Sequence, residues 1–520
     1  MYFMDDWKVT PRLTLNLGMR WEIIPPFYEV TDRMSQVSLS VQNPEVGRPG
    51  ALVFADRVNN TYWRQFLPRF GFAWRATDKM VVRGGYAITS TPPIANNWGY
   101  GGFTFGFNGS VPTIAGTSST GFADDPTMYL RNPYPNAPNP LPNSDPSSAN
   151  YLDVATTAPD ANRPGYTQNY NFTIQYALPG STVLEVAYVG NKGTRMWGGS
   201  PGSGYTDYNG LPSRLLAMGD ILNDPVSDHP EYTPFPGFDT SFSVAQALRP
   251  YPQYGRVNEQ FPYNTNSNYN SLQVTVTRHL TNNLGFLAAY TFSKAIGYID
   301  ANGPGAYYTS VQDYYNRSLD RSITEFSTPH EFKLTWVYET PFGKGRRWNL
   351  GWANAILGGW QVAGIHNYTS GLPIQVNYSG FIIPTGFAPN IRPDIVASQQ
   401  QKLTGAPTQT DFTQGTGYLN PAAFTVPPTT ANGIPLRPGT APRFLPNVRG
   451  PHRMRETFRM SKRFYIREKM FFGIGGTADN LFKRTTRDFL GLDIADPGSF
   501  GQLVQRGGGR TIQLEGRFEF

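Results

Sequence analysis

Apolar and polar residues alternate along many short segments of this chain, most clearly over its last eleven residues, 510–520. Ile512, Leu514, Phe518 and Phe520 share one side of an extended strand, with threonine, glutamine, glutamate and arginine between them. A period of two indicates a β-strand with one oily and one charged face. A soluble sandwich strand shows the same alternation, but we interpret these four residues as the closing and assembly signal of an outer-membrane barrel.

The alternating segments come in pairs that are joined by short turns rich in Pro, Gly, Asn and Asp. Together with the final strand, the pairs make about thirteen strands. The short turns within the pairs suit a transmembrane barrel. The predicted pairs cover 1–7 with 13–24, 62–76 with 80–90, 166–178 with 183–196, 268–279 with 284–298, 328–340 with 357–370, and 453–462 with 469–482.

Long polar stretches separate the pairs. Connections of this length are improbable in one compact soluble domain, and tandem soluble β-domains would not need them always on one side. Short turns alternating with long loops are typical of an all-β, antiparallel transmembrane barrel with short periplasmic turns and long extracellular loops. The predicted extracellular loops run over about 25–61, 91–165, 197–267, 299–327, 371–452 and 483–509.

The composition agrees with a barrel. Aromatic residues make up 14% and charged residues only 16%, and the mean hydropathy of -0.40 suits a polar lumen that offsets an apolar outside. The chain has no cysteine, which excludes disulfides, thiolate metal sites and cysteine nucleophiles. No run approaches the ~18 apolar residues of a transmembrane helix. We therefore expect the outer membrane of a Gram-negative bacterium.

The odd strand number affects how the chain begins. Closed bacterial barrels have even numbers of strands. If the carboxyl terminus lies in the periplasm, the strand at 1–7 starts at the outer face, and the first residues show no signal-peptide pattern. We therefore expect residues 1–520 to be the carboxyl-terminal part of a longer protein, whose signal peptide and early strands lie outside them.

Three groups of segments resemble the large TonB-dependent transporters of the Oar-like type. The resemblance implies a barrel of about 22 strands with a plugged lumen, of which this chain supplies the carboxyl-terminal part, with the plug outside residues 1–520. The segments are Asp5–Lys8 followed by Thr10–Arg20, then Pro68–Trp74 with Val82–Tyr86, and finally Asp479–Phe482, Phe500–Gln502 and Arg510–Leu514.

Charged residues recur on the polar sides of the predicted strands. In a barrel they point into the lumen, where they contact a plug or line a passage. We favour packing between plug and wall over substrate recognition. The candidate lumen-facing charges are Arg20, Glu22, Arg69, Arg75, Arg83, Glu185, Glu331, Lys333, Glu515 and Arg517.

The sequence offers little for catalysis or cofactor binding. The five histidines lack metal-ligand spacing, and no G-x-S-x-G, H-E-x-x-H or Walker A motif is present. We predict neither an enzyme nor a cofactor. Asp488, Asp493 and Asp496 are candidate calcium ligands in a loop, although we favour a solvated loop. The net charge of +7 is spread along the chain, which argues against nucleic acid.

The alternating strands predict an outer-membrane barrel, and the resemblance implies that it is a TonB-dependent transporter that takes up a scarce substrate through a plugged barrel. The expected partners are outer-membrane lipid, the barrel assembly machinery, an extracellular substrate of unknown class, and the TonB complex through a plug outside this chain. Two alternatives remain open, a structural or adhesive surface protein and an unplugged porin-like pore.

Overall fold

The computed structural model describes the chain apart from some turns and loop segments. Five of the predicted loops, 25–61, 91–165, 197–267, 299–327 and 371–452, therefore lie partly outside the described residues. The residues not described are 27, 92–104, 106, 108–143, 158–162, 197, 199–206, 260–262, 282, 299–310, 344–345, 389, 404–415 and 467–469.

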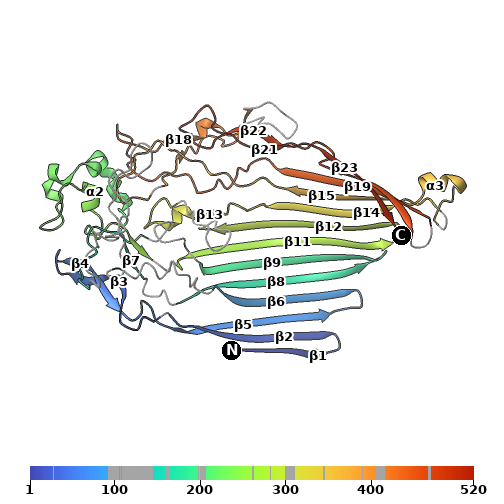
Figure 1. Ribbon diagram of the computed structural model, residues 1–520, viewed down its shortest axis with the longest axis horizontal. Helices are drawn as coiled ribbons and strands as arrows, with labels where there is room; N and C mark the ends of the chain where they lie inside the picture. The colour runs from blue at the N-terminus through green and yellow to red at the C-terminus, as the bar shows by residue number, and fades with distance from the viewer. Residues whose placement is uncertain are drawn as a thin grey trace, which may run out of the picture.

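One large antiparallel sheet dominates the described part of the chain (Figure 1). It has fourteen strands, of which thirteen follow one path in chain order and the short β13 (Ser322–Ile323) pairs beside β12. The path runs through β1 (Tyr2–Thr10), β2 (Leu13–Ile24), β5 (Tyr62–Arg75), β6 (Met80–Thr91), β8 (Gly165–Leu178), β9 (Thr182–Met196), β11 (Thr265–Thr281), β12 (Leu284–Gly297), β14 (His330–Glu339), β15 (Trp360–Thr369), β19 (Arg453–Tyr465), β20 (Phe471–Asp479) and β23 (Thr511–Glu519).

The predicted pairs of strands are confirmed, with small shifts of their ends. The short connections lie together at one end of the sheet and the long connections at the other (Figure 1). The short-turn connection between β14 and β15 is the longest of its kind and holds η5 (Gly351–Ala353) and α3 (Asn354–Leu357). We call the two ends of the sheet the short-turn end and the long-loop end.

The pairing register gives the sheet one apolar and one polar face. Two neighbouring rows of directly paired residues show the contrast. The row on the apolar face is Trp7, Leu15, Phe72, Gly84, Phe172, Tyr188, Leu272 and Phe292, and the row on the polar face is Asp6, Asn16, Gly71, Gly85, Asn171, Val189, Ser271 and Ser293. Because side chains alternate along each strand, these rows extend into two whole faces.

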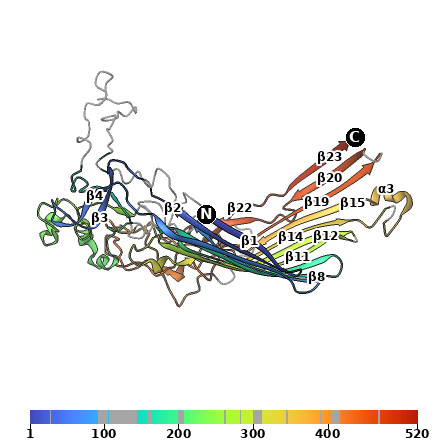
Figure 2. The ribbon, with the colours of Figure 1, turned by 90° about the horizontal axis from the view of Figure 1, so that it is seen from below.

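The sheet is strongly curved but open, and its edges β1 and β23 lie apart (Figure 2). Every neighbouring pair along the path is antiparallel. Thirteen alternating strands make β1 and β23 run in the same direction. The two edges therefore cannot pair with each other in the antiparallel manner of the rest of the sheet.

The long connections fold into a layer of their own, the loop layer. Its strands are β3 (Met34–Asn43), β4 (Arg48–Ala55), β7 (Val154–Thr156), β10 (Val257–Glu259), β16 (Asp394–Ile395), β17 (Thr416–Gly417), β18 (Phe424–Thr425), β21 (Thr486–Phe489) and β22 (Gln502–Gly507). Its helical turns are η1 (Ser213–Asn223), η2 (Val226–Asp228), η3 (Pro230–Tyr232), α2 (Val244–Ala247), η4 (Arg317–Asp320) and η6 (Pro421–Ala423). These connections carry more regular structure than their composition indicates.

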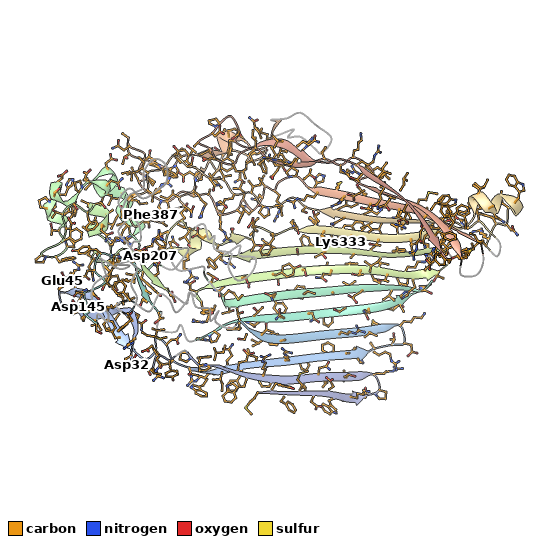
Figure 3. The ribbon with its side chains drawn as sticks, in the orientation of Figure 1. Asp32, Glu45, Asp145, Asp207, Lys333 and Phe387 are labelled. Atoms are coloured by element: carbon orange, nitrogen blue, oxygen red, sulfur yellow. The ribbon has the colours of Figure 1, made fainter. Side chains whose placement is uncertain are left out.

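Most of the buried apolar side chains belong to the loop layer rather than to the sheet. They form four clusters, one of which joins Leu216 of η1 to Val311 and Phe387 of two later connections. Figure 3 shows Phe387 and Asp207 in this layer and Lys333 on the sheet. The loop layer is therefore a packed body with its own core.

Buried ion pairs also join the connections. Arg392 pairs with Asp320 at 2.7 Å, and their side chains are 2% and 1% exposed. The Arg392 guanidinium also donates to the carbonyls of Ala441 and Leu319 at 2.9 and 2.8 Å. Arg249 and Asp207 form a second pair at 3.4 Å, each 4% exposed. A buried charge is costly unless it is paired and hydrogen-bonded, so these contacts hold the layer in one arrangement.

Among the described residues, no helix has the length and apolar character needed to span a membrane.

Candidate functional site: the polar face of the sheet

The register places all ten charges that the sequence singled out on the polar face. Glu185, for example, is paired with Thr275 on β11 and with Gln175 on β8. The ten are Arg20, Glu22, Arg69, Arg75, Arg83, Glu185, Glu331, Lys333, Glu515 and Arg517. They spread from β2 to β23, so they line the face rather than gather at one point.

Several of these charges pair within one strand, two residues apart. Arg20 contacts Glu22 at 2.6 Å, and Lys333 contacts Glu331 at 2.6 Å. Positions i and i+2 point to the same side of a strand, which brings such pairs together. Among the described carboxylates, none pairs with Arg69, Arg75 or Arg83. This part of the polar face keeps free positive charge.

One ion pair crosses an entire strand. Arg459 of β19 binds Glu515 of β23 through two hydrogen bonds, the longer of which joins Nη1 to Oε2 at 3.2 Å. Between them lies Gly475 of β20, the direct partner of Glu515. A Cβ atom on Gly475 would stand 2.7 Å from Oε1 of Glu515. Glycine at this position therefore opens the way for a contact that links β19 to the last strand.

A hollow of about 610 Å³ opens around this pair at the short-turn end. It is lined by strands β14, β15, β19, β20 and β23 and by the turn after β14. Its cations are Arg346, Arg459, Lys462, Arg463 and Arg517, whereas its carboxylates are Glu339 and Glu515. Arg346, Arg459 and Arg517 are paired with Glu339, Glu515 and Glu519, and Lys462 donates to backbone carbonyls. Arg463 has no carboxylate partner among the described residues, and guanidinium groups bind carboxylates and phosphates strongly, so this arginine suits an acidic surface or ligand.

A second hollow, of about 220 Å³, lies nearer β1 and is almost neutral. Gly71 and Gly85 form its floor, and the amides of Asn16 and Asn171 stand beside them. Asn16 donates a hydrogen bond of 2.6 Å to Asp6. The two hollows of the polar face therefore differ in their linings: amides stand in the one nearer β1, and arginines in the one nearer β23.

Sequence reasoning missed most of the arginines of β19. Arg453, Arg455, Arg459 and Arg463 all lie on the polar face, and Arg455 pairs with Asp479 at 2.6 Å. Their odd-numbered spacing is the signal that could have found them, because a period of two puts them on one side of a strand. The ion pair between Arg459 and Glu515 depends on the register of β19, β20 and β23, so it could not be predicted from the sequence.

The residues assigned to barrel closure lie at the free edge of the sheet. Ile512, Leu514 and Phe518 point to the apolar face of β23, opposite Ala478, Gly476 and Phe472. Phe520 follows the end of the strand and is 91% exposed, and its ring lies 6.1 Å from that of Phe518. Both aromatic rings are thus free to meet a membrane or a partner.

The three candidate calcium ligands do not converge. Asp493 accepts hydrogen bonds from the backbone of Ser379 and Ala495, and Asp496 accepts them from Gly498 and Ser499. Asp488 bonds the backbone of Phe489, its neighbour. The described residues contain no group of three or more His, Cys, Asp or Glu side chains that could share a metal ion.

An open antiparallel sheet with one apolar face, one charged face and all its long loops at one end defines an outer-membrane β-barrel type of protein. Residues 1–513 match the family model described as an outer membrane beta barrel domain, so the chain belongs to this family. It is a protein of the outer membrane of a Gram-negative bacterium. A comparison with curated proteins gives no match.

The solved structures that this chain matches are longer than the chain itself. The chain spans between 37% and 53% of the length of those it matches first. One is the outer membrane transporter YddB from Escherichia coli, at 10% identity and a TM-score of 0.42, with 100% of this chain and 53% of the other covered. Another is the ferric-catecholate import receptor Fiu from E. coli K12, at 12% identity and a TM-score of 0.37, with 100% and 44% covered.

Proposed function

We propose that this chain forms part of the wall of a TonB-dependent transporter of the Oar-like type. The loop layer faces the outside of the cell and captures a substrate. The polar face packs against a plug that lies outside these 520 residues, and the periplasmic TonB complex pulls on that plug to open a path. No bond is made or broken, so the chain acts in transport and not as an enzyme.

The observation that carries this proposal is the arginine-rich hollow of the polar face. It lies at the short-turn end, away from the loop layer, so a substrate caught by the loops reaches it last. Arg463 has no carboxylate partner among the described residues, and the partners of Arg459 and Arg517, which are Glu515 and Glu519, are part-exposed, so the hollow offers hydrogen-bond donors to acidic groups. An acidic part of a plug would accept hydrogen bonds from these donors whenever no substrate is passing. We therefore favour the plug over the substrate as the partner of this hollow.

The open sheet supports a second part of the proposal. In a membrane, the unpaired backbone groups of β1 and β23 would each lose hydrogen bonds that water cannot replace. The strands β1 and β23 run in the same direction. Joining them directly would therefore give a parallel pair and a barrel with an odd number of strands. We propose that strands outside these 520 residues cover both edges.

A pair of cysteine substitutions tests whether the lumen is plugged. The chain has no native cysteine, so each new thiol is the only one it carries. Ser461→Cys places a thiol on the polar face within the arginine-rich hollow, and Met460→Cys places one on the apolar face next to it. Intact cells are treated with a charged, membrane-impermeant maleimide. Val30→Cys, at a loop position that is 94% exposed, sets the rate for free access.

We expect slow labelling of Ser461→Cys, because the plug blocks the path from outside, and no labelling of Met460→Cys, because lipid covers it. In an unplugged pore, Ser461→Cys would be labelled at a rate close to that of Val30→Cys.

The genomic sequence upstream of residue 1 distinguishes a transporter from an adhesive surface protein with no passage. An in-frame signal peptide, TonB-contacting segment and plug support transport, and their absence from an intact gene contradicts it.

A further inference from the structure

Two exposed aromatic rings stack on each other in the loop layer. The rings of Tyr151 and Phe242 lie 5.6 Å apart and only 10° from parallel, and the two residues are 40% and 37% exposed. Phe242 also contacts the buried Phe238, with 5.9 Å between ring centroids. The stack is therefore backed by the core of the loop layer, and Tyr151 is its solvent-facing member.

The backbone holds Tyr151 in this position. Its φ of +69° lies in the left-handed region, which bulky residues rarely adopt. The backbone N–H of Tyr151 donates a hydrogen bond of 2.6 Å to the carbonyl of Gln253, a residue that is fully buried. A fixed backbone thus presents the ring, and a fixed side chain loses less entropy when it binds a partner.

Two exposed carboxylates stand close to the Tyr151 ring. Glu45, in the turn between β3 and β4, accepts a hydrogen bond of 2.8 Å from the side chain of Asn150. Asp239 accepts two from Ser241, at 2.9 and 2.7 Å. Burial raises the pKa of Tyr151, and the negative charges of Glu45 and Asp239 add to this. We call Glu45, Tyr151, Asp239 and Phe242 together the tip surface.

The negative charge of the tip surface is not neutralised by the chain. Among the residues that the structure describes, no cation pairs with Glu45 or Asp239, and none stands over the ring of Tyr151. Arg48, the cation of the same hairpin as Glu45, donates instead to the carbonyl of Pro234 at 2.8 Å. A ring face and two carboxylates therefore stand together without a cation.

Elsewhere in the loop layer the chain fills the same arrangement with an arginine of its own. The Arg57 guanidinium lies 4.8 Å from the centre of the Tyr28 ring and donates a hydrogen bond of 2.6 Å to its hydroxyl. It also pairs with the Asp56 carboxylate at 3.2 Å. A guanidinium can stack on an aromatic ring while its edge donates to a carboxylate, and an ammonium lacks that plane. The tip surface offers the same ring and carboxylate chemistry without the arginine.

The position of the tip surface suits a large partner. Figure 1 shows β3, β4 and α2 at the end of the loop layer away from the sheet, and Figure 3 places Glu45 at this outer margin. Small ligands bind in concave sites that cover most of their surface. An exposed ring beside exposed carboxylates instead suits one side chain from a protein surface, where arginine is a frequent anchor.

We infer that the tip surface binds an arginine side chain of an extracellular polypeptide. The guanidinium stacks on Tyr151, and Glu45 and Asp239 accept its hydrogen bonds. Only the extracellular position of the surface rests on the proposed function, through the orientation of the long-loop end. The binding requires neither a plug nor a transported substrate, so it can fail while transport holds, and transport can fail while it holds.

The test measures binding of fluorescent peptides to the full chain purified in detergent, by fluorescence anisotropy. One peptide with blocked ends carries three arginines, a second carries citrulline at the same positions, and a third carries lysine. Citrulline keeps the shape of arginine without its charge. Unlabelled argininamide is the competitor. The net charge of +7 on the chain disfavours unspecific binding of cationic peptides.

Substitutions locate the binding on the tip surface. Tyr151→Leu removes the ring and Tyr151→Phe keeps it, whereas Glu45→Gln removes a charge and keeps an oxygen as acceptor. The matched controls are Tyr28→Leu, whose ring is already covered by Arg57, and Asp32→Asn, an exposed carboxyl in the same connection as Glu45.

The wild-type protein should bind the arginine peptide at least about tenfold more tightly than the citrulline peptide, and more tightly than the lysine peptide. Added salt should weaken the binding. Tyr151→Leu and Glu45→Gln should each weaken it about threefold or more. Tyr151→Phe and the two controls should stay within about twofold of wild type.

Equal affinity of the wild-type protein for the arginine and citrulline peptides overturns the inference, even if a variant fails to assemble. Equal affinity for the arginine and lysine peptides does so too, because it removes the need for a guanidinium. So does an assembled Tyr151→Leu or Glu45→Gln variant with unchanged affinity. Argininamide that competes as well as the peptide at equal guanidinium concentration would indicate a site for small cations and would also contradict a polypeptide partner.

Discussion

The indole ring of Trp336 on β14 lies over Gly364, its direct partner on β15, on the apolar face of the sheet. A Cβ atom at Gly364 would stand 2.5 Å from the indole Nε1, so any side chain there displaces the ring. That nitrogen donates a hydrogen bond of 3.0 Å to Nε2 of His366. Glycines under cross-strand aromatic rings help to fix the register of a sheet. The same arrangement recurs with Phe72 over Gly84 and with Tyr170 over Gly190.

Replacing Gly364 by valine should therefore destabilise the sheet by roughly 1–3 kcal/mol. The valine side chain would displace the Trp336 indole from its position over Gly364 and break its hydrogen bond to His366. The midpoint of urea unfolding in lipid vesicles, followed by Trp fluorescence, measures the change. Ala363→Val places the same side chain one residue away on the polar face and should cost much less. Equal effects of the two substitutions would show that the ring does not depend on glycine.

Sequence reasoning could predict the strands and their faces, because both depend on a local period of two. The strand at Leu13–Ile24 was predicted with both ends correct, and that at Thr511–Glu519 within one residue. Short turns rich in glycine, proline and asparagine made the pairing of neighbours readable as well. The order of the thirteen strands then followed from the chain itself.

The interior of the loop layer could not be predicted in the same way. Arg392 and Asp320 are 72 residues apart in the sequence, and no local pattern brings them together. The hairpin of Met34–Asn43 and Arg48–Ala55 lies inside a segment expected to be a loop. Its strands are held by burial of Val37 and Leu52 against residues from distant connections. Such contacts depend on the tertiary arrangement of several loops.

Arg392→Met should weaken the loop layer selectively. It leaves the Asp320 carboxylate buried without its partner, which costs about 3–5 kcal/mol. Native-state hydrogen exchange should show faster exchange in residues 311–323, 391–403 and 416–445 while the central strands of the sheet keep their protection. Arg517→Met breaks the exposed pair with Glu519 and should change stability by less than about 1 kcal/mol. If hydrogen exchange in the loop layer is equally fast in Arg392→Met and Arg517→Met, the buried ion pair does not stabilise the layer.

Acid should loosen the loop layer through Asp394. Burial opposes ionisation of this carboxyl, but hydrogen bonds from Arg437 and Thr440 outweigh it and hold the pKa of Asp394 below its usual value. A lowered pKa in the folded state gives stability that is present above the unfolded value, about 3.9, and is lost as the pH falls through the folded value. Limited proteolysis of the loop layer should therefore accelerate below about pH 4.

Asp394→Asn should remove that acid-dependent step and should raise the rate of proteolysis at neutral pH by weakening the contact with Arg437 by roughly 1–3 kcal/mol. Asp32→Asn changes an exposed carboxyl in another connection and should keep the wild-type profile. A wild-type acid profile in Asp394→Asn would mean that other groups govern the loosening.

Deletion of Phe520 should impair assembly of the protein in the outer membrane without reducing its synthesis. The last aromatic residues lie at the free edge of the sheet, where the final strand must be recognised and paired. Heat-modifiable mobility and resistance to protease measure the assembled fraction. Glu519→Gln is the control, because it keeps the aromatic end and changes only a polar-face side chain. Normal assembly of the deletion variant would contradict the role given to Phe520.

If one face of the sheet meets lipid and the other does not, consecutive residues of β11 must alternate in their contact with acyl chains. Single cysteines at Leu272, Gln273, Val274 and Thr275 carry a fluorophore in vesicles of brominated lipid, which quenches only probes in contact with acyl chains. We expect strong quenching at Leu272 and Val274, on the apolar face, and weak quenching at Gln273 and Thr275, on the polar face. Equal quenching at all four positions, or the opposite alternation, would contradict it.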